Sequence, residues 1–261
     1  MNDLTCMSYW FPKIVAAGLP VPRTTLLTMP MDAFMDIYRL FDGKDMEGKA
    51  EPFFVELRAA AADIGFPVFL RTGLTSGKHE WDRTCYVTKA EDVAEHAMNI
   101  LYFWECCGIG NPDTNIWAVR EFLPTLPLGV CPHYDNMPIC REFRFFVNDG
   151  AIVCWHPYWP RHALERGGVP EDQLDRIYDA LCRGGDDPAL HKIASEAGRV
   201  LGGAWSVDLL ETSRGWYLTD MAVAAQSFHW EGCAAAAARE SGPASRQPEP
   251  LPNTAAEESQ E

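Results

Sequence analysis

Two acidic residues, Asp208 and Asp220, stand in a stretch that is typical of a β-hairpin. The stretch reads WSVDLLETSRGWYLTDMA at 205–222, with a Thr-Ser-Arg-Gly turn between two apolar strand patterns. A hairpin returns its second strand beside the first, so the two carboxylates can converge on one face. Converging carboxylates are costly without a cation, and Mg²⁺ bound to nucleotide phosphates is the usual cation for such a pair. The simpler alternative is a surface hairpin with two solvated acids.

A glycine-rich loop, GLTSGKHEW at 73–81, separates the buried-strand pattern FPVFLRT at 66–72 from a second strand pattern at 83–88. Glycines let the backbone approach a ligand closely, and loop amides with a nearby lysine can hold phosphate. Lys78 in this loop and Arg71 near the end of the first strand are therefore candidates to grip phosphate oxygens. A solvated hairpin with two free cations explains this segment equally well when it is taken alone.

A third strand pattern, at 116–123, ends in Arg-Glu-Phe-Leu directly before a proline-rich stretch. A strand that ends in a linker between two lobes can offer backbone groups to a flat base. The alternative is an edge strand with an ordinary salt bridge.

The segment REFRFF at 141–146 places Glu142, Arg144 and Phe146 on one strand face by alternation. Arg141 and the two other phenylalanines then occupy the opposite face. Glu142 and Arg144 could form a structural ion pair, or the acid could orient an arginine that grips phosphate. We favour the second interpretation because this strand leads toward the acidic hairpin.

Helices and hairpins alternate irregularly along the rest of the chain. Helices are predicted at 32–41, 52–64, 90–106, 170–182 and 188–201, and a second hairpin is predicted at 142–156 around an Asn-Asp-Gly turn. Antiparallel hairpins mixed with helices indicate an α+β fold. An alanine-rich closing helix is predicted at 233–240, and the Pro-, Ser- and Glu-rich residues 240–261 read as a disordered tail.

Composition excludes several classes of protein. The 261 residues are 47% hydrophobic and carry a net charge of −15, which argues against binding the phosphate backbone of a nucleic acid. A nucleotide needs only a few local cations, so it remains possible. No run of about 18 apolar residues predicts a membrane span. The N-terminal sequence lacks the pattern of a signal peptide, so a cytoplasmic location is expected.

Cysteine and histidine patterns do not define a site. The nine cysteines are odd in number and contain no CxxC pair, so reduced thiols are expected rather than a disulfide framework. Cys154, His156 and His162 have a spacing that fits no standard zinc pattern. The histidines show no Ser/His/Asp or Cys/His arrangement, and the sequence has no GxSxG, HExxH or Walker A motif.

Taken in order, the segments PK…AAGLPVPRT, GFPVFLRT…SGK, VREFL, REFRFFVNDGAIV and VDLL…GWYLTDMA resemble the ATP-grasp superfamily. They are most similar to a divergent branch that includes phage ATP-grasp proteins and the eukaryotic assembly chaperones of a translation initiation factor. The resemblance implies two lobes whose antiparallel sheets clasp a nucleotide. It implies an N-terminal element at 1–65, a small lobe at 66–120 and a large lobe at 121–239, before the tail at 240–261.

The resemblance also implies roles for particular residues. ATP and Mg²⁺ are the implied cofactors, with Lys78 and Arg144 as catalytic residues and Asp208 and Asp220 as metal ligands. The implied nucleotide-binding residues are Arg71, Lys78, Glu121, Phe122, Leu123, Glu142 and Arg144. Arg71 stands where the family usually has lysine, and Asp220 where it usually has glutamate. Ala222 stands where the family commonly has an asparagine that also binds metal.

The leading hypothesis for function is an ATP- and Mg²⁺-dependent ligase that activates a carboxylate as an acyl phosphate for attack by an amine or similar nucleophile. Its substrate would be a small molecule or peptide, with an acceptor pocket lined by Trp155, His156, Trp159 and Arg161. The alternative is an assembly factor that binds ATP and a protein partner without ligating them, and Ala222 favours it. A third possibility is an α+β protein without a nucleotide site.

Overall fold

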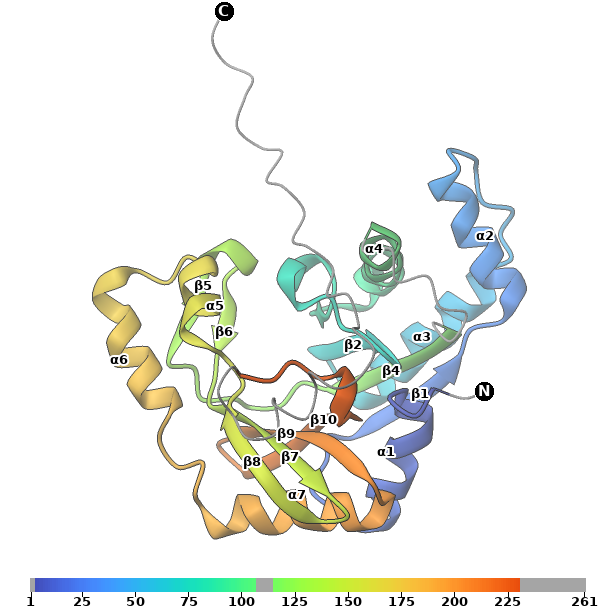
Figure 1. Cartoon of the computed structure of the whole chain (residues 1–261). Helices are drawn as coiled ribbons and strands as arrows, with labels where there is room; N and C mark the ends of the chain where they lie inside the picture. The colour runs from blue at the N-terminus through green and yellow to red at the C-terminus, as the bar shows by residue number, and fades with distance from the viewer. Residues whose placement is uncertain (1–2, 107–114, 231–261) are drawn as a thin grey trace, which may run out of the picture.

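The computed structural model describes residues 3–106 and 115–230, and these form two four-stranded antiparallel sheets flanked by helices (Figure 1). Sheet A has the order β1-β4-β2-β3, with β1 (Thr24–Thr28), β2 (Val68–Thr72), β3 (Tyr86–Val87) and β4 (Ile116–Glu121). Sheet B has the order β10-β9-β7-β8, with β7 (Glu142–Asn148), β8 (Ala151–Pro157), β9 (Ala204–Thr212) and β10 (Gly215–Val223). A short hairpin joins β5 (Gly129–Cys131) to β6 (Met137–Ile139).

Helices cover one face of each sheet. On sheet A, Trp117 and Val119 pack against α2 (Met31–Phe41), α3 (Glu51–Ile64) and α4 (Val93–Cys106). On sheet B, Phe143, Phe145 and Val207 pack against α1 (Met7–Ala16) and α7 (Pro188–Leu201). A third apolar cluster joins the β5–β6 hairpin to α5 (Arg161–Arg166) and α6 (Glu171–Leu181). The charged faces of the two sheets are left to meet each other.

The α+β fold predicted from the sequence is confirmed, and so are the main helices and hairpins. The β7–β8 turn shows why the Asn-Asp-Gly pattern was informative. Asp149 and Gly150 have φ of 49° and 81°, the positive values that a tight hairpin turn with native twist requires.

Three features differ from the sequence expectation. The strand predicted at 83–88 is reduced to β3, and the preceding loop contains a 3₁₀ helix, Lys78–Arg83. The β5–β6 hairpin and the six-residue helix α5 were not predicted, because strands of three residues are too short to show alternation. The helix predicted at 233–240 and the tail at 240–261 lie outside the described residues. Within the described ranges, no helix combines the length and apolarity that a membrane crossing requires.

Candidate functional site

A row of charged residues crosses sheet B on the face that is not covered by helices. Asp220 on β10 is the register partner of Asp208 on β9, which in turn is the partner of Arg144 on β7. His156 on β8 completes the row as the partner of Arg144. The two acids of the hairpin therefore lie directly opposite each other, as the strand pattern predicts.

A β-bulge next to this row changes which side chains face the cleft. The register of β10 against β9 shifts between Leu218 and Asp220, so the neighbours Thr219 and Asp220 both line the same cavity. The hydroxyl of Thr219 donates to Oε1 of Glu142 at 3.1 Å. Bulges commonly re-aim side chains beside functional sites, and here one adds a hydroxyl to the acidic row.

Each acid of the row is held by an arginine. Arg144 donates from Nε and Nη2 to the two carboxylate oxygens of Asp208, at 2.8 and 2.7 Å. Burial alone would lower the pKa of Arg144, but the charge and hydrogen bonds of Asp208 raise it above its usual value. Nη1 of Arg71 lies 3.0 Å from Oδ2 of Asp220, so this pair joins sheet A to sheet B.

Lys78 begins the 3₁₀ helix after Gly77, which has a φ of 63° that favours glycine. Its ammonium lies 4.9 Å from the centre of the Tyr158 ring, and the guanidinium of Arg144 lies 4.8 Å from the same ring. Burial would lower the pKa of Lys78, but the charge of Glu142, with weaker contributions from the two aspartates, raises it above its usual value. Lys78 therefore stays protonated beside the acidic row.

Burial raises the pKa of Glu142 above the usual value of a glutamate, although Lys78 opposes the shift. The residue is 5% exposed and lines the cavity. Glu142 and Arg144 do share a face, as alternation predicts, but Arg144 is paired with Asp208 rather than with Glu142.

Arg120 on β4 is a cleft residue that sequence reasoning did not single out. It is 3% exposed, and its Nη1 donates to the Thr219 carbonyl at 2.6 Å. Nη2 is buried and has no hydrogen-bond partner among the described residues. Burial and the charge of Arg71 lower the pKa of Arg120. Strand pairing could have revealed it, because Arg120 lies opposite Phe69, two residues along β2 from Arg71 and therefore on the same face.

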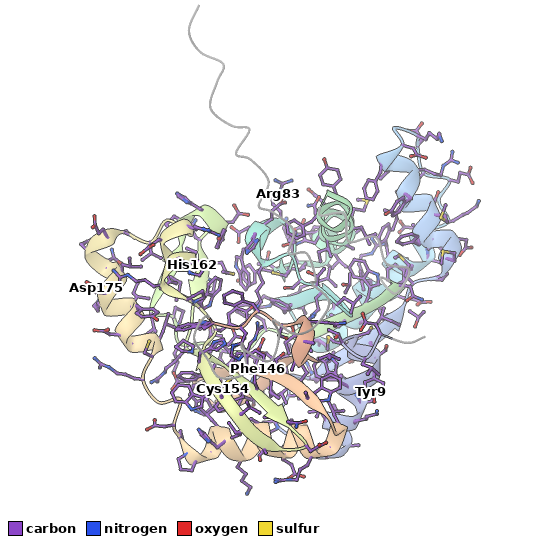
Figure 2. The ribbon with its side chains drawn as sticks, viewed as in Figure 1. Tyr9, Arg83, Phe146, Cys154, His162 and Asp175 are labelled. Atoms are coloured by element: carbon purple, nitrogen blue, oxygen red, sulfur yellow. The ribbon has the colours of Figure 1, made fainter. Side chains whose placement is uncertain are left out.

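A cavity of about 790 Å³, including the part open to solvent, lies between the two sheets. This volume is within the range of small-molecule sites. One part of the wall is apolar and aromatic, formed by Phe69, Trp81, Phe122, Leu123, Met137 and Trp159. The polar part is formed by Arg71, Lys78, Arg120, Glu142, Thr219 and Asp220. Side chains from both sheets crowd this central region in Figure 2.

The expected base-binding linker borders the cavity through Glu121, Phe122 and Leu123. The Leu123 carbonyl already accepts the Thr125 N–H at 2.8 Å. The Glu121 carboxylate is paired with Arg214 at 2.6 Å. The aromatic and apolar side chains of this segment, rather than these two engaged groups, are therefore what it presents to a ligand.

The four residues expected to line an acceptor pocket are divided by the structure. Trp159 lines the cavity, and His156 ends the charged row on sheet B. Trp155 instead packs against Phe143 and Phe145 on the helix-covered face. Arg161 lies in α5, where it pairs with Glu165 and Asp175. Strand alternation explains the first separation, because neighbouring residues of β8 point to opposite faces.

The sequence matches a family described as an ATP-grasp domain of clade family 3 over residues 47–239, which is more than half of the chain. The chain belongs to this ATP-grasp family. The predicted resemblance to a divergent ATP-grasp branch is thereby confirmed. No curated protein matches the sequence.

Solved structures also resemble this chain. C-terminally truncated Cdc123 from Schizosaccharomyces pombe has a TM-score of 0.51 at 11% identity, over 84% of this chain and 83% of that one. The RimK domain protein ATP-grasp from Sphaerobacter thermophilus has a TM-score of 0.46 at 14% identity, over 85% of this chain. D-alanine–D-alanine ligase from Bacillus anthracis has a TM-score of 0.41 at 9% identity, over 84% of this chain. The chain spans only 58% and 54% of the last two proteins.

The donor set does not form a metal cage from protein groups alone. Across residues 3–106 and 115–230, no three His, Cys, Asp or Glu side chains gather closely enough to hold a metal ion. Cys154, His156 and His162 therefore make no zinc site. Asp208 and Asp220 remain as two facing carboxylates, which is the number that Mg²⁺ commonly uses when phosphate oxygens supply further ligands.

Proposed function

We propose that this chain binds ATP with Mg²⁺ between its two sheets and transfers the terminal phosphoryl group to a carboxylate. The acyl phosphate formed would then be attacked by an amine or similar nucleophile. The observation that carries the proposal is the buried Arg120 guanidinium, which lines the cavity and whose Nη2 has no partner within residues 3–106 and 115–230. A buried cation without a partner is costly unless an anion joins it. A phosphate group is an anion of suitable charge and hydrogen-bonding capacity.

The division of the cavity supports a nucleotide rather than a simple anion. The apolar part, with Phe69, Phe122 and Met137, suits a flat base. The polar part brings Arg71, Lys78 and Arg120 to the same cavity, and this part suits a chain of phosphates. ATP-grasp domains bind ATP, and family membership is consistent with this assignment.

Asp208 and Asp220 would hold the magnesium ion. They fit it because they face each other and because the nearby cations leave room for phosphate oxygens as the other ligands. When bound, Mg²⁺ supplies charge neutralisation and fixes the phosphate oxygens. The chain's own contribution is to orient these carboxylates, through Arg144 on one and Arg71 on the other.

Lys78 and Arg144 would stabilise negative charge on the group being transferred. Both cations lie over the Tyr158 ring, so they approach the cleft from the same place. The acids around Lys78 raise its pKa and keep it charged. Fixed cations in a partly dry cleft stabilise developing charge more strongly than solvated ones.

A second candidate is an assembly factor that binds ATP and a protein partner but transfers nothing. Ala222 favours it, because this residue is the register partner of Ser206, directly beside the acidic row, and its side chain offers no oxygen to a metal. This protein would bind Mg²⁺-ATP tightly and show no carboxylate-dependent formation of ADP.

The test is an assay of ADP formation with a panel of small carboxylic acids and acidic peptides, in the presence of hydroxylamine. Hydroxylamine traps acyl phosphates as hydroxamates. We expect carboxylate-dependent hydroxamate from the wild type and a loss of at least about tenfold in Lys78→Met. Lys89→Met is the matched control, because Lys89 lies outside the cavity and pairs with Glu91 and Asp92. ATP binding without any hydroxamate across the panel would favour the assembly factor.

A further inference from the structure

A thiol and an imidazole meet on sheet B one row beyond Arg144. Sγ of Cys154 on β8 lies 3.0 Å from Nε2 of His229. Cys154 is the register partner of Phe146 on β7, and Figure 2 shows these two side chains on the neighbouring strands. The sequence contains no adjacent Cys/His motif because the two residues are 75 positions apart.

The hydrogen bonds of His229 fix its tautomer. Its Nδ1 lies 3.2 Å from the Trp230 carbonyl oxygen, which can only accept, so Nδ1 carries the proton in the neutral ring. Nε2 is then an acceptor, and the Cys154 thiol donates to it. Nucleophile, base and orienting group thus stand in the order that activates catalytic thiols.

The surroundings hold the His229 ring in place. Its centre lies 4.0 Å from that of Phe146, and the residue is 8% exposed. His156 lies beside it at 5.6 Å between ring centres and is 6% exposed. Nδ1 of His156 donates to the Pro157 carbonyl, and its buried Nε2 has no partner in the described part of the chain. An unpartnered acceptor beside the thiol is a place for a polar group of an incoming molecule.

Cys154 differs from the other cysteines for which a pKa shift is resolved. Burial raises the pKa values of Cys131 and Cys140 to about 11 and that of Cys85 to about 12, so these thiols are inert. Cys182 is half-buried like Cys154, but burial raises its pKa as well. Among these cysteines, Cys154 alone combines partial exposure with a contact to a histidine ring nitrogen.

We propose that Cys154 is a nucleophile that accepts an acyl group from an acyl phosphate, with His229 as its base. Cys154 lies two residues along β8 from His156, the partner of Arg144, which is about 7 Å of strand. The thiolate attacks the carbonyl carbon, the bond between that carbon and the phosphate oxygen breaks, and inorganic phosphate leaves with the electron pair. The thiol proton goes to Nε2 of His229, and the product is a thioester. The choice of acyl phosphate rests on the proposed function.

The test supplies acetyl phosphate already formed, so it needs no ATP and its result is independent of ATP binding. Peptide-resolved mass spectrometry would follow S-acetylation of the full chain, with iodoacetamide as a second probe of the same thiols. We expect Cys154 to be acetylated at least about tenfold faster than Cys182, which is the internal control. Cys154→Ser should remove this signal and leave the Cys182 rate unchanged.

His229→Ala should slow the acetylation of Cys154 by about tenfold or more, and added imidazole should restore much of the rate. Rescue by free imidazole would not follow if His229 served only to pack against Phe146. Equal rates at Cys154 and Cys182 would overturn the proposal. So would an unchanged rate in His229→Ala, or rapid alkylation by iodoacetamide without any acetylation.

Discussion

The two arginine–aspartate pairs of the cleft are built in different ways. Arg144 and Asp208 are register partners in one sheet, joined by two hydrogen bonds, and their side chains are 16% and 5% exposed. Arg71 and Asp220 belong to different sheets and are joined by one ion pair, in which the Asp220 side chain is 39% exposed. The first pair is fixed by strand register, whereas the second depends on how closely the sheets approach.

This difference suggests different duties for the two acids. Asp208 is part of the framework, because its carboxylate is fully engaged and buried. Asp220 has solvent access, so it can exchange part of its contact with Arg71 for a cation or a phosphate-bound ion. A cleft that must open to admit a nucleotide can use the inter-sheet pair as its closing contact.

The largest effect is expected from Asp208→Asn, which leaves the buried Arg144 without its carboxylate. Breaking a buried pair in this way costs about 3–5 kcal/mol. The free energy of unfolding, measured by urea denaturation, should fall by that amount. Asp175→Asn is the control, since it breaks the exposed Arg161–Asp175 pair and should cost less than about 1 kcal/mol. Equal losses in the two variants would show that the fixed pair has no special structural role.

Arg120→Met tests the unpartnered cation and should separate binding from stability. The affinity for ATP should fall by about tenfold or more, since a charged hydrogen bond is lost. The free energy of unfolding without ATP should change by less than about 1 kcal/mol, because burying this guanidinium is itself costly. Calorimetric titration and denaturation would measure the two quantities. A large loss of stability with normal ATP affinity would mean that Arg120 is only a structural link between the sheets.

The pH dependence of stability should report on the end of the fixed row. Burial is the main cause that lowers the pKa of His156 from its usual 6.5 to about 4, with help from Arg144 and His229 and against the Pro157 carbonyl. Between these values the unfolded chain takes up a proton that the folded chain does not. Stability from this group is therefore complete above pH 6.5 and is lost as the pH falls toward 4.

The full shift corresponds to roughly 3 kcal/mol, and partial solvent access reduces the expected change to about 1–2 kcal/mol. His156→Gln should flatten the stability profile between pH 6.5 and 4 by this amount, as followed by urea denaturation at several pH values. A variant profile parallel to that of the wild type would show that His156 titrates normally in the folded protein.

The smallest effect on stability is expected from Asp220→Asn. Its half-exposed side chain should contribute less than about 1 kcal/mol through the pair with Arg71. Arg71→Met and the double variant would complete a thermodynamic cycle by denaturation. A coupling as large as that of a buried pair would mean that the two sheets are locked together rather than able to separate.

Much of this site was readable from strand alternation and turn chemistry. Asp208 and Asp220 could be placed opposite each other because a short turn sets the register of a hairpin. The pairing of Arg144 with Asp208 could not be predicted, because a long segment with several helices separates β7 from β9 and their register is set by packing. Arg120 was missed for a similar reason, since its burial depends on the approach of sheet B.

The contact of Cys154 with His229 was the least accessible to sequence reasoning. It requires the segment after β10 to return across sheet B, where His229 lies on Phe146. No local pattern of hydrophobicity encodes that path. The β5–β6 hairpin escaped prediction for a simpler reason, because three-residue strands carry too few alternating positions.

The most direct test of the account is calorimetric titration of ATP, with and without Mg²⁺, into the wild type and Asp220→Asn. Asp220→Asn is preferred to Asp208→Asn because its fold should be nearly unchanged. We predict Mg²⁺-dependent binding to the wild type that weakens by at least about tenfold in the variant. Absence of ATP binding to the wild type, or equal Mg²⁺-dependent affinity in both proteins, would contradict the assignment of this cleft as a metal–nucleotide site.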